Sequence, residues 1–288
     1  MKLRGQVAVV TGGSRGLGLA VSQRLLQEGA HLVITARHES ALAQAGQALR
    51  DARAEPTQCV VWQAGDVSNP ADVQALASLV DTTFGRIDVL VCNAGVNGPM
   101  GCVDALEWGE WVRAIEINLF GAVLWCQAAV PIMRRQKRGK IIMISGGGAT
   151  RPIPRFSAYS ASKAALVRFA ETLAAELAGT GIDVNAVAPG GMNTRLLDEV
   201  LAAGPDRVGE ALFENAVRQQ QHGGTSPDTG AALVAFLAGH ESDGITGRLL
   251  AAVWDDWVNL PQIRERLSGS DVYTLRRIIP ADRGWDSP

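Results

Sequence analysis

The chain is poor in cysteine, with four residues scattered over 288 positions (Cys59, Cys92, Cys102 and Cys126) and no Cys-x-x-Cys pair. This spacing argues against a disulfide framework or a zinc site and favours reduced, buried thiols. The four histidines also lack the spacing of metal ligands, so no metal site is predicted.

An excess of charge is also missing, because 27 lysines and arginines stand against 29 aspartates and glutamates, a net charge of −2. A near-neutral chain without a basic half gives no electrostatic reason to expect nucleic acid or an anionic membrane as a partner. The N-terminus has no apolar signal-peptide region, and the apolar stretch Leu119–Met133 has only fifteen residues, including Gln127 and Pro131. We therefore predict a cytoplasmic protein without a membrane span.

The sequence does contain a regular alternation of short apolar runs with longer helical patterns such as Pro70–Phe84 and Ser157–Leu177. Continuous apolar runs are typical of parallel strands buried on both faces, and their alternation with helices indicates right-handed βαβ units. The predicted fold class is α/β, a single domain on a doubly wound parallel sheet, with ligands at the carboxyl ends of the strands. The predicted strands are Val7–Val10, Leu32–Ala36, Cys59–Trp62, Val89–Cys92, Ile141–Ile144, Val184–Ala188 and Leu249–Val253.

Residues 1–253 make up this predicted domain, and the long connection 190–221, which has its own helical pattern, is predicted to be a mobile substrate loop. Residues 254–288 form a C-terminal extension. It carries Trp254, Trp257 and Trp285, too much apolar surface to leave in solvent, so we expect it to pack on the domain or on a partner subunit.

A glycine-rich turn follows the first strand and opens a helix. Glycines let the backbone approach a pyrophosphate, and the helix N-terminus offers unpaired N–H groups to it. The spacing is Gly-x-x-x-Gly-x-Gly, and a tight strand-to-helix turn would need the same residues, but the position favours a dinucleotide site. The candidate residues in the turn are Gly12, Ser14, Arg15, Gly16, Leu17 and Gly18.

The end of the second strand chooses between the two nicotinamide dinucleotides. An NAD site needs a carboxylate there for the ribose hydroxyls, whereas this chain has Arg37 and no acid before Glu39. A guanidinium grips a 2′-phosphate in bidentate fashion, and Arg15 lies within reach of the same group. We therefore predict NADP(H) rather than NAD(H); the alternative is that both arginines are simply solvated.

Tyr159 and Lys163 stand four residues apart on a helical pattern, so their side chains share one face. An ammonium beside a phenol stabilises the phenolate and lowers the pKa of the phenol from its ordinary value of about 10. The pair can then give a proton to a carbonyl oxygen or take one from an alcohol.

Taken together, these motifs resemble those of single-domain short-chain dehydrogenases/reductases, over residues 5–253. The resemblance implies a Rossmann-like fold, with Tyr159 as proton donor or acceptor and Lys163 tuning it and binding the nicotinamide ribose. It also implies that Asn118 kinks its helix and holds a water molecule. The remaining implied cofactor contacts are Asp66 and Val67 at the adenine, Asn93, Ala94 and Gly95 after the fourth strand, and Pro189, Gly190 and Thr194 at the nicotinamide.

One position departs from the family pattern. Similar enzymes carry a serine thirteen residues before the tyrosine, but Gly146 stands there and Ser145 is one residue early. Because side chains alternate along a strand, Ser145 is expected to face away unless a bulge turns it. Otherwise a backbone N–H of the glycine run, Ser157 or a water molecule must supply the second hydrogen bond to the substrate.

The sequence thus predicts an NADP(H)-dependent oxidoreductase, of the ketoreductase kind, that interconverts a carbonyl and a secondary alcohol on a small organic substrate. The alternative is a catalytically weak or inactive NADP(H)-binding regulatory protein of the same fold; a sugar epimerase would need a larger substrate domain. The helical patterns around Trp111–Met133 and Tyr159–Leu177 carry few charges, which indicates burial by a neighbour. Members of the family that the chain resembles pair these same helices, so the resemblance implies a homodimer or homotetramer.

Overall fold

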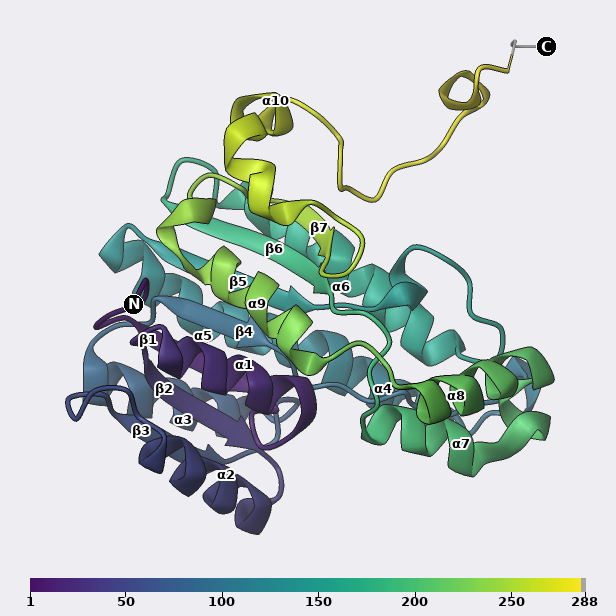
Figure 1. Ribbon diagram of the computed structural model, residues 1–288, viewed down its shortest axis with the longest axis horizontal. Coiled ribbons are helices and arrows are strands. Elements are labelled where there is room, and N and C mark those ends of the chain that lie inside the picture. Colours follow the sequence, from purple (N-terminus) through teal and green to yellow (C-terminus); the bar gives the residue numbers. More distant parts are fainter. Residues whose placement is uncertain (286–288) are drawn as a thin grey trace.

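Seven parallel strands form one sheet in the order β3-β2-β1-β4-β5-β6-β7 (Figure 1). The computed structural model describes residues 1–285. Each predicted apolar run coincides with a strand to within two residues at either end, so the predicted doubly wound sheet is confirmed. The strands are β1 (Val7–Thr11), β2 (His31–Ala36), β3 (Val60–Ala64), β4 (Val89–Cys92), β5 (Gly139–Ile144), β6 (Ile182–Ala188) and β7 (Arg248–Ala251).

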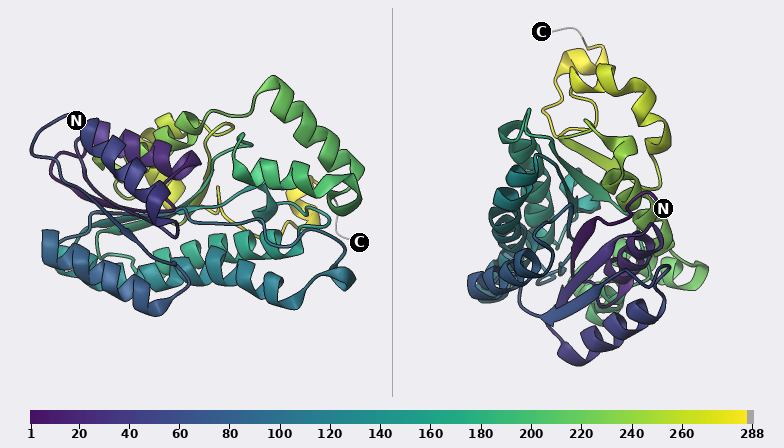
Figure 2. Two further views of the ribbon diagram at one scale, coloured as in Figure 1. Left: turned by 90° about the horizontal axis from the view of Figure 1, so that it is seen from below. Right: turned by 90° about the vertical axis from the view of Figure 1, so that its left-hand side faces the viewer.

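Helices cover both faces of this sheet, and Figure 2 shows the two layers. A hydrophobic core lies between the sheet and each layer. Because most strands are covered on both sides, both sets of side chains along them are apolar, which explains the unbroken apolar runs. One layer contains α1 (Gly16–Gln27), α2 (Glu39–Asp51) and α9 (Pro227–Ala238); the other contains α3 (Pro70–Phe84), α5 (Gly121–Gln136) and α6 (Ser157–Glu176).

Local signals fix where the helices begin and end. At the start of α3, the Asn69 side chain accepts a hydrogen bond from the Ala71 N–H at 3.0 Å, and Pro70 occupies the first turn. Gly85 ends this helix in a left-handed conformation, with φ of 68°. Proline lacks the N–H that would be unpaired in a first turn, and glycine adopts positive φ without steric cost, so the sequence encodes both ends.

The strand order reverses beside β1. From β1 the chain moves outward to β2 and β3, then returns to place β4 on the other side of β1. The loops that leave β1 and β4 therefore separate in opposite directions and open a crevice at the carboxyl edge of the sheet. Open α/β sheets bind ligands at such a reversal.

A longer helical run than the sequence predicted crosses the second layer. Helix α4 (Trp108–Ile115), a π-helical turn (Glu116–Phe120) and α5 form one helix of 29 residues, Trp108–Gln136, rather than the fifteen-residue apolar stretch. By length and hydropathy this helix is long enough to cross a membrane, and 44% of its most apolar window is buried in the protein. In the fold it packs against the sheet through buried side chains such as Trp125.

The connection 190–221 carries two helices, α7 (Arg195–Val208) and α8 (Glu210–His222), which we call the lid. The lid stands beside the carboxyl edge of the sheet (Figure 1). Gly204, with φ of 76°, breaks α7 one turn before its end.

The C-terminal extension first returns to the domain. The Arg248 guanidinium of β7 donates to the carbonyls of Leu267, Ser270 and Val272 at 2.6, 2.9 and 2.7 Å, which fixes the segment that contains α10 (Arg264–Ser268). Of its three tryptophans, only Trp257 packs inward, 5.4 Å from the Phe236 ring.

Trp254 and Trp285 of the extension are 82% and 69% exposed in the single chain, and Trp254 lies on the wall of the cavity described below. Packing of the extension on a partner subunit stays a prediction. After α10 the end of the extension leads away from the domain (Figure 1), and residues 286–288 of the predicted extension lie outside the described part.

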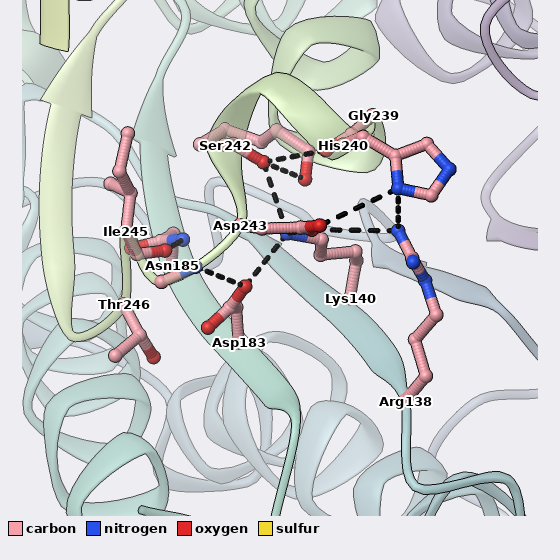
Figure 3. A network of polar contacts seen from close by, with 12 residues as sticks. Arg138, Lys140, Asp183, Asn185, Gly239, His240, Ser242, Asp243, Ile245 and Thr246 are labelled. Atoms are coloured by element: carbon pink, nitrogen blue, oxygen red, sulfur yellow. Dashed lines mark hydrogen bonds and ion pairs between the residues drawn. The ribbon is translucent and has the colours of Figure 1, made fainter. Parts of the chain in front are cut away.

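A buried lysine joins the amino ends of β5 and β6 to the turn before β7 (Figure 3). The Lys140 ammonium lies 2.7 Å from the Asp183 carboxylate and 2.8 Å from that of Asp243, and its side chain is only 4% exposed. Burial alone would raise the pKa of Asp243, but Lys140 and Arg138 hold that pKa below its ordinary value.

We expect Lys140→Met to lower the free energy of unfolding by about 3–5 kcal/mol, because two carboxylates lose a buried counterion. Urea denaturation measures the loss. The matched control is Lys2→Met, which removes an exposed pair with Glu241 at 2.7 Å and should cost less than about 1 kcal/mol. Equal losses in the two variants would contradict a stabilising role for the buried network.

Candidate active site

One cavity of about 1410 Å³ opens at the carboxyl edge of the sheet, where the strand order reverses. Every residue that the sequence proposed for the site lines this cavity except Asn118, which lies behind it. The predicted residues on its wall are Gly12, Ser14, Arg15, Gly16, Leu17, Gly18, Arg37, Asp66, Val67, Asn93, Ala94, Gly95, Tyr159, Lys163, Pro189, Gly190 and Thr194.

The glycine turn packs so tightly that no side chain fits at Gly18. A Cβ atom there would lie 2.1 Å from the Gly12 carbonyl oxygen and 2.5 Å from the Asn93 amide nitrogen. The turn is thus held against the loop that follows β4, and its residues line the cavity. A glycine turn that opens a helix at this edge of the sheet is suited to cradle a pyrophosphate, and we call it the glycine cradle.

Thr11 connects the two loops that border the crevice. Its hydroxyl oxygen accepts hydrogen bonds from the Asn93 N–H at 2.9 Å and the Ala94 N–H at 3.1 Å, and the Asn93 amide donates to the Thr11 carbonyl at 2.9 Å. The sequence analysis did not single out Thr11 as a site residue. The sequence feature that could have indicated its role is a hydroxyl residue at the end of an otherwise apolar run, directly before the glycine turn. In the structure this hydroxyl residue is buried.

Positive charge gathers at one end of the cavity. Within residues 1–285, neither Arg15 nor Arg37 forms an ion pair with a carboxylate. Burial, followed by the nearby charges of Arg195 and Arg37, lowers the pKa of Arg15. Unpaired guanidinium groups this close together favour a bound anion such as a phosphate.

Asp66 is engaged on both carboxylate oxygens. One accepts from the Ser68 N–H at 3.0 Å and the Ser68 hydroxyl at 2.6 Å, and the other pairs with Arg113 of α4. Burial raises the pKa of Asp66, but Ser68 and Arg113 outweigh it and leave the pKa below its ordinary value. Asp66 is therefore a fixed negative acceptor at the wall, beside Val67.

Tyr159 and Lys163 lie on the face of α6 that points into the cavity. Burial lowers the pKa of Lys163 to about 8, and its ammonium donates to the Ile144 carbonyl at 2.8 Å. Burial raises the pKa of Tyr159, with the Lys163 nitrogen 5.9 Å from the centre of the phenol ring. A lowered pKa was predicted for Tyr159 from its spacing to Lys163; burial of the phenol shifts the pKa upward instead.

Asn118 lies in the π-helical turn, and its side chain approaches Gly95 on the side away from the cavity. Its side chain accepts from the Val96 N–H at 2.8 Å and donates to the Val96 carbonyl and the Ser162 hydroxyl, both at 2.9 Å. Gly95 separates it from the cavity, because a Cβ there would lie 3.2 Å from the Asn118 oxygen and 3.4 Å from the Lys163 nitrogen. Ser162, which completes this contact, was missed by the sequence analysis.

The position of the usual serine is filled by the tyrosine itself. A Cβ atom on Gly146 would lie 2.2 Å from the Tyr159 hydroxyl, so the phenol occupies the space that a serine side chain needs. Ser145 lies on the cavity wall, but its hydroxyl oxygen is enclosed and has no hydrogen-bond partner within residues 1–285. The Ser157 hydroxyl accepts from the Trp111 indole at 3.1 Å.

The lid and the C-terminal extension supply walls that spacing alone did not reveal. Apolar lid residues, including Leu196, Val200 and Leu212, face the cavity, and so do Trp254 and Tyr273 of the extension. These residues carry no motif, and only the fold brings them to the mouth of the site.

Comparison with known proteins agrees with this geometry. The family model described as short chain dehydrogenase matches residues 6–203. The chain is 32% identical over 246 residues to "Dehydrogenase/reductase SDR family member 4" of Sus scrofa, covering 85% of each chain. NAD+-bound xylitol dehydrogenase superimposes with a TM-score of 0.80 and 28% identity, covering 87% of this chain and 98% of that one. A variant actinorhodin polyketide ketoreductase with NADPH gives a TM-score of 0.77 and 31% identity, covering 85% and 95%.

The sheet, the glycine cradle and the tyrosine–lysine pair define an α/β oxidoreductase. The chain belongs to the short chain dehydrogenase family, as its motifs predicted.

We expect Gly146→Ala to lower turnover by a factor of about 100 or more, because the new methyl group displaces the Tyr159 hydroxyl from its position. Gly146→Ser should behave alike rather than improve the enzyme. Steady-state rates with a carbonyl substrate measure both. Gly147→Ala is the control, since a Cβ there meets only Arg151 at 3.6 Å. Turnover that is unchanged in both Gly146 variants would show that the approach of Tyr159 is unimportant.

Proposed function

We propose that this chain is an NADP(H)-dependent oxidoreductase that interconverts a carbonyl and a secondary alcohol on a small organic substrate, with Tyr159 as the general acid/base. The observation that carries the proposal is the meeting of Tyr159 and Lys163 with the glycine cradle in one cavity. Two of the similar solved proteins are an NAD+-bound xylitol dehydrogenase and an NADPH-bound ketoreductase, both named for such chemistry.

The residues of the wall fit a nicotinamide dinucleotide. The cradle would hold the pyrophosphate, Asp66 and Val67 the adenine, and Asn93, Ala94 and Gly95 the middle of the molecule. Pro189, Gly190 and Thr194 would hold the nicotinamide end, where the bound cofactor supplies or accepts a hydride.

Tyr159 is set to act as a proton donor at neutral pH. Because burial raises its pKa, the phenol keeps its proton in the neutral range and can pass it to a carbonyl oxygen. After the transfer a phenolate remains on Tyr159. Lys163, which is fixed at the Ile144 carbonyl, stabilises this phenolate when the lysine is protonated.

Arg37 and Arg15 support NADP(H) over NAD(H). Both face the cavity at the end of β2 and the start of α1, and neither forms an ion pair with a described carboxylate. A 2′-phosphate would provide the missing negative charge, whereas the ribose hydroxyls of NAD(H) would find no carboxylate at Arg37.

A second candidate is a catalytically weak or inactive NADP(H)-binding regulatory protein. It is favoured by the one departure from the family pattern, since neither Gly146 nor Ser145 presents a hydroxyl to the substrate oxygen. Removal of one such donor costs a few kcal/mol of transition-state stabilisation, which slows a reductase without abolishing it.

We also propose a homodimer or homotetramer in the cytoplasm, without nucleic acid or membrane as a partner. Trp108 and Phe120 are 72% and 50% exposed on the helical run that contains α4, and a second copy would cover them.

Tyr159→Phe should reduce the rate of NADPH-dependent carbonyl reduction by a factor of about 100–10,000, because the proton donor is lost, while the Kd for NADPH changes little. A panel of ketones and quinones, followed by NADPH absorbance, measures the rate. Tyr273→Phe alters the only other tyrosine, also on the cavity wall, and should leave the rate unchanged. Equal rates in Tyr159→Phe and the parent protein refute the proposal; NADPH binding without any turnover supports the regulatory alternative.

Arg37→Gln should weaken NADPH binding by about tenfold and leave NADH binding unchanged, because only NADPH carries the 2′-phosphate. Fluorescence titration of both cofactors gives the two Kd values. Arg24→Gln, which removes an arginine paired with Glu28 on α1, is the control and should alter neither. Comparable affinities for both cofactors in the parent protein would contradict the preference for NADP(H).

A further inference from the structure

Arg195, the first residue of α7, faces the cavity but belongs to none of the motifs of the sequence. Its guanidinium lies 3.2 Å from the Glu199 carboxylate one turn later, and the two side chains are 39% and 34% exposed. A pair this exposed contributes little to stability. We therefore consider what the ion pair does to the position of the Arg195 guanidinium rather than to the stability of the fold.

Glu199 is fixed from a second side by Asn97. The Asn97 amide donates to the other Glu199 oxygen at 3.0 Å and to the Leu196 carbonyl at 2.9 Å. Asn97 is 6% exposed and follows β4 closely in sequence, so it ties the first turn of the lid to the wall of the site. Arg195 lines the cavity whereas Glu199 does not, so the carboxylate holds the guanidinium from outside.

The guanidinium is held next to the glycine turn. Thr194, the residue before it, lies against Gly16, since a Cβ on Gly16 would be 3.6 Å from the Thr194 methyl carbon. Arg195 is also close enough to Arg15 for its charge to lower the pKa of Arg15. Two cations therefore flank the N-terminus of α1, and one carboxylate, Glu199, balances them only in part.

We propose that Arg195 is a further cofactor-binding residue, which exchanges the Glu199 carboxylate for the pyrophosphate of the dinucleotide. Glu199 and Asn97 are positioning residues that aim Arg195 at the glycine turn before the ligand arrives. The inference rests on the proposed binding of a nicotinamide dinucleotide in this cavity. It assigns Arg195 to the pyrophosphate rather than to the 2′-phosphate, because Thr194 places the start of the lid at Gly16, whereas the 2′-phosphate is assigned to Arg37.

This exchange has two physical consequences. Because Arg195 is part of the lid, each bound pyrophosphate draws the start of α7 towards the cradle. Because Glu199 and the pyrophosphate compete for the same guanidinium, the carboxylate weakens ligand binding even though it positions the residue that binds.

Binding without substrate tests the assignment. The Kd values for NADPH, NADH, ADP-ribose and adenosine 2′-phosphate are measured by calorimetry or fluorescence. Arg195→Gln should weaken the first three ligands by a common factor of about ten and leave adenosine 2′-phosphate unchanged, because only that ligand lacks the pyrophosphate. Arg195→Lys should recover part of the loss. Arg207→Gln, near the end of α7 and away from the cavity, should change nothing.

The role of Glu199 has the opposite sign. Glu199→Gln should tighten binding of the three pyrophosphate ligands by about threefold, because the competing charge is removed while the contact with Asn97 can persist. In the Arg195→Gln background the same substitution should have a clearly smaller effect, because only the influence of Glu199 on Arg15 is left. A merely structural ion pair would instead make both single variants bind more weakly.

The possible failures are distinguishable. If the parent protein binds neither NADPH nor NADH, the proposed function and this inference both fall. If it binds them, the inference alone is overturned by unchanged binding of NADH and ADP-ribose in Arg195→Gln, by a loss confined to ligands with a 2′-phosphate, or by weaker binding in Glu199→Gln.

Discussion

The contact between two loops at the reversal of strand order organises the whole site. The Thr11 hydroxyl accepts from the backbone N–H groups of Asn93 and Ala94, while the Asn93 amide bonds back to the Thr11 carbonyl. These bonds hold the glycine turn against the loop after β4, and the absence of a side chain at Gly18 allows the approach. Because both loops are fixed by buried parallel strands, the cradle is formed before any ligand binds, so little ordering entropy opposes binding.

Burial of Tyr159 and Lys163 changes the pKa values of both side chains. It raises the pKa of Tyr159 and lowers the pKa of Lys163 to about 8, which keeps both groups nearer their neutral forms than they would be in water. The protein thus has a protonated phenol in a largely apolar cavity, beside an ammonium fixed at a strand carbonyl. The missing serine fits this arrangement, since the Tyr159 hydroxyl occupies the space that a side chain at Gly146 would need.

Much of the fold and of the cofactor end could be predicted from the sequence, and the reason is local. Apolar runs mark strands because both faces are covered, and Asn69, Pro70 and Gly85 mark helix ends through backbone bonds of adjacent residues. Asn118 was found through its resemblance to a family pattern, but its bonds to Val96 and Ser162 depend on contacts 22 and 44 residues away. The predicted lowering of the Tyr159 pKa used only the spacing between Tyr159 and Lys163. That spacing does not reveal how deeply the phenol is buried, and burial raises the pKa.

The sequence by itself determined the order of strands and helices, the glycine turn and the tyrosine–lysine spacing. It also determined that no carboxylate stands between the end of the second strand and Glu39. Each of these is a property of residues close together along the chain. Only the tertiary structure decided that Arg195 and Arg15 line the same cavity, that Trp254 and Tyr273 reach it, and that Lys140 joins Asp183 to Asp243. Those contacts join segments far apart in the chain, and the packing of the sheet and its helices, which no local pattern records, sets the distances between them.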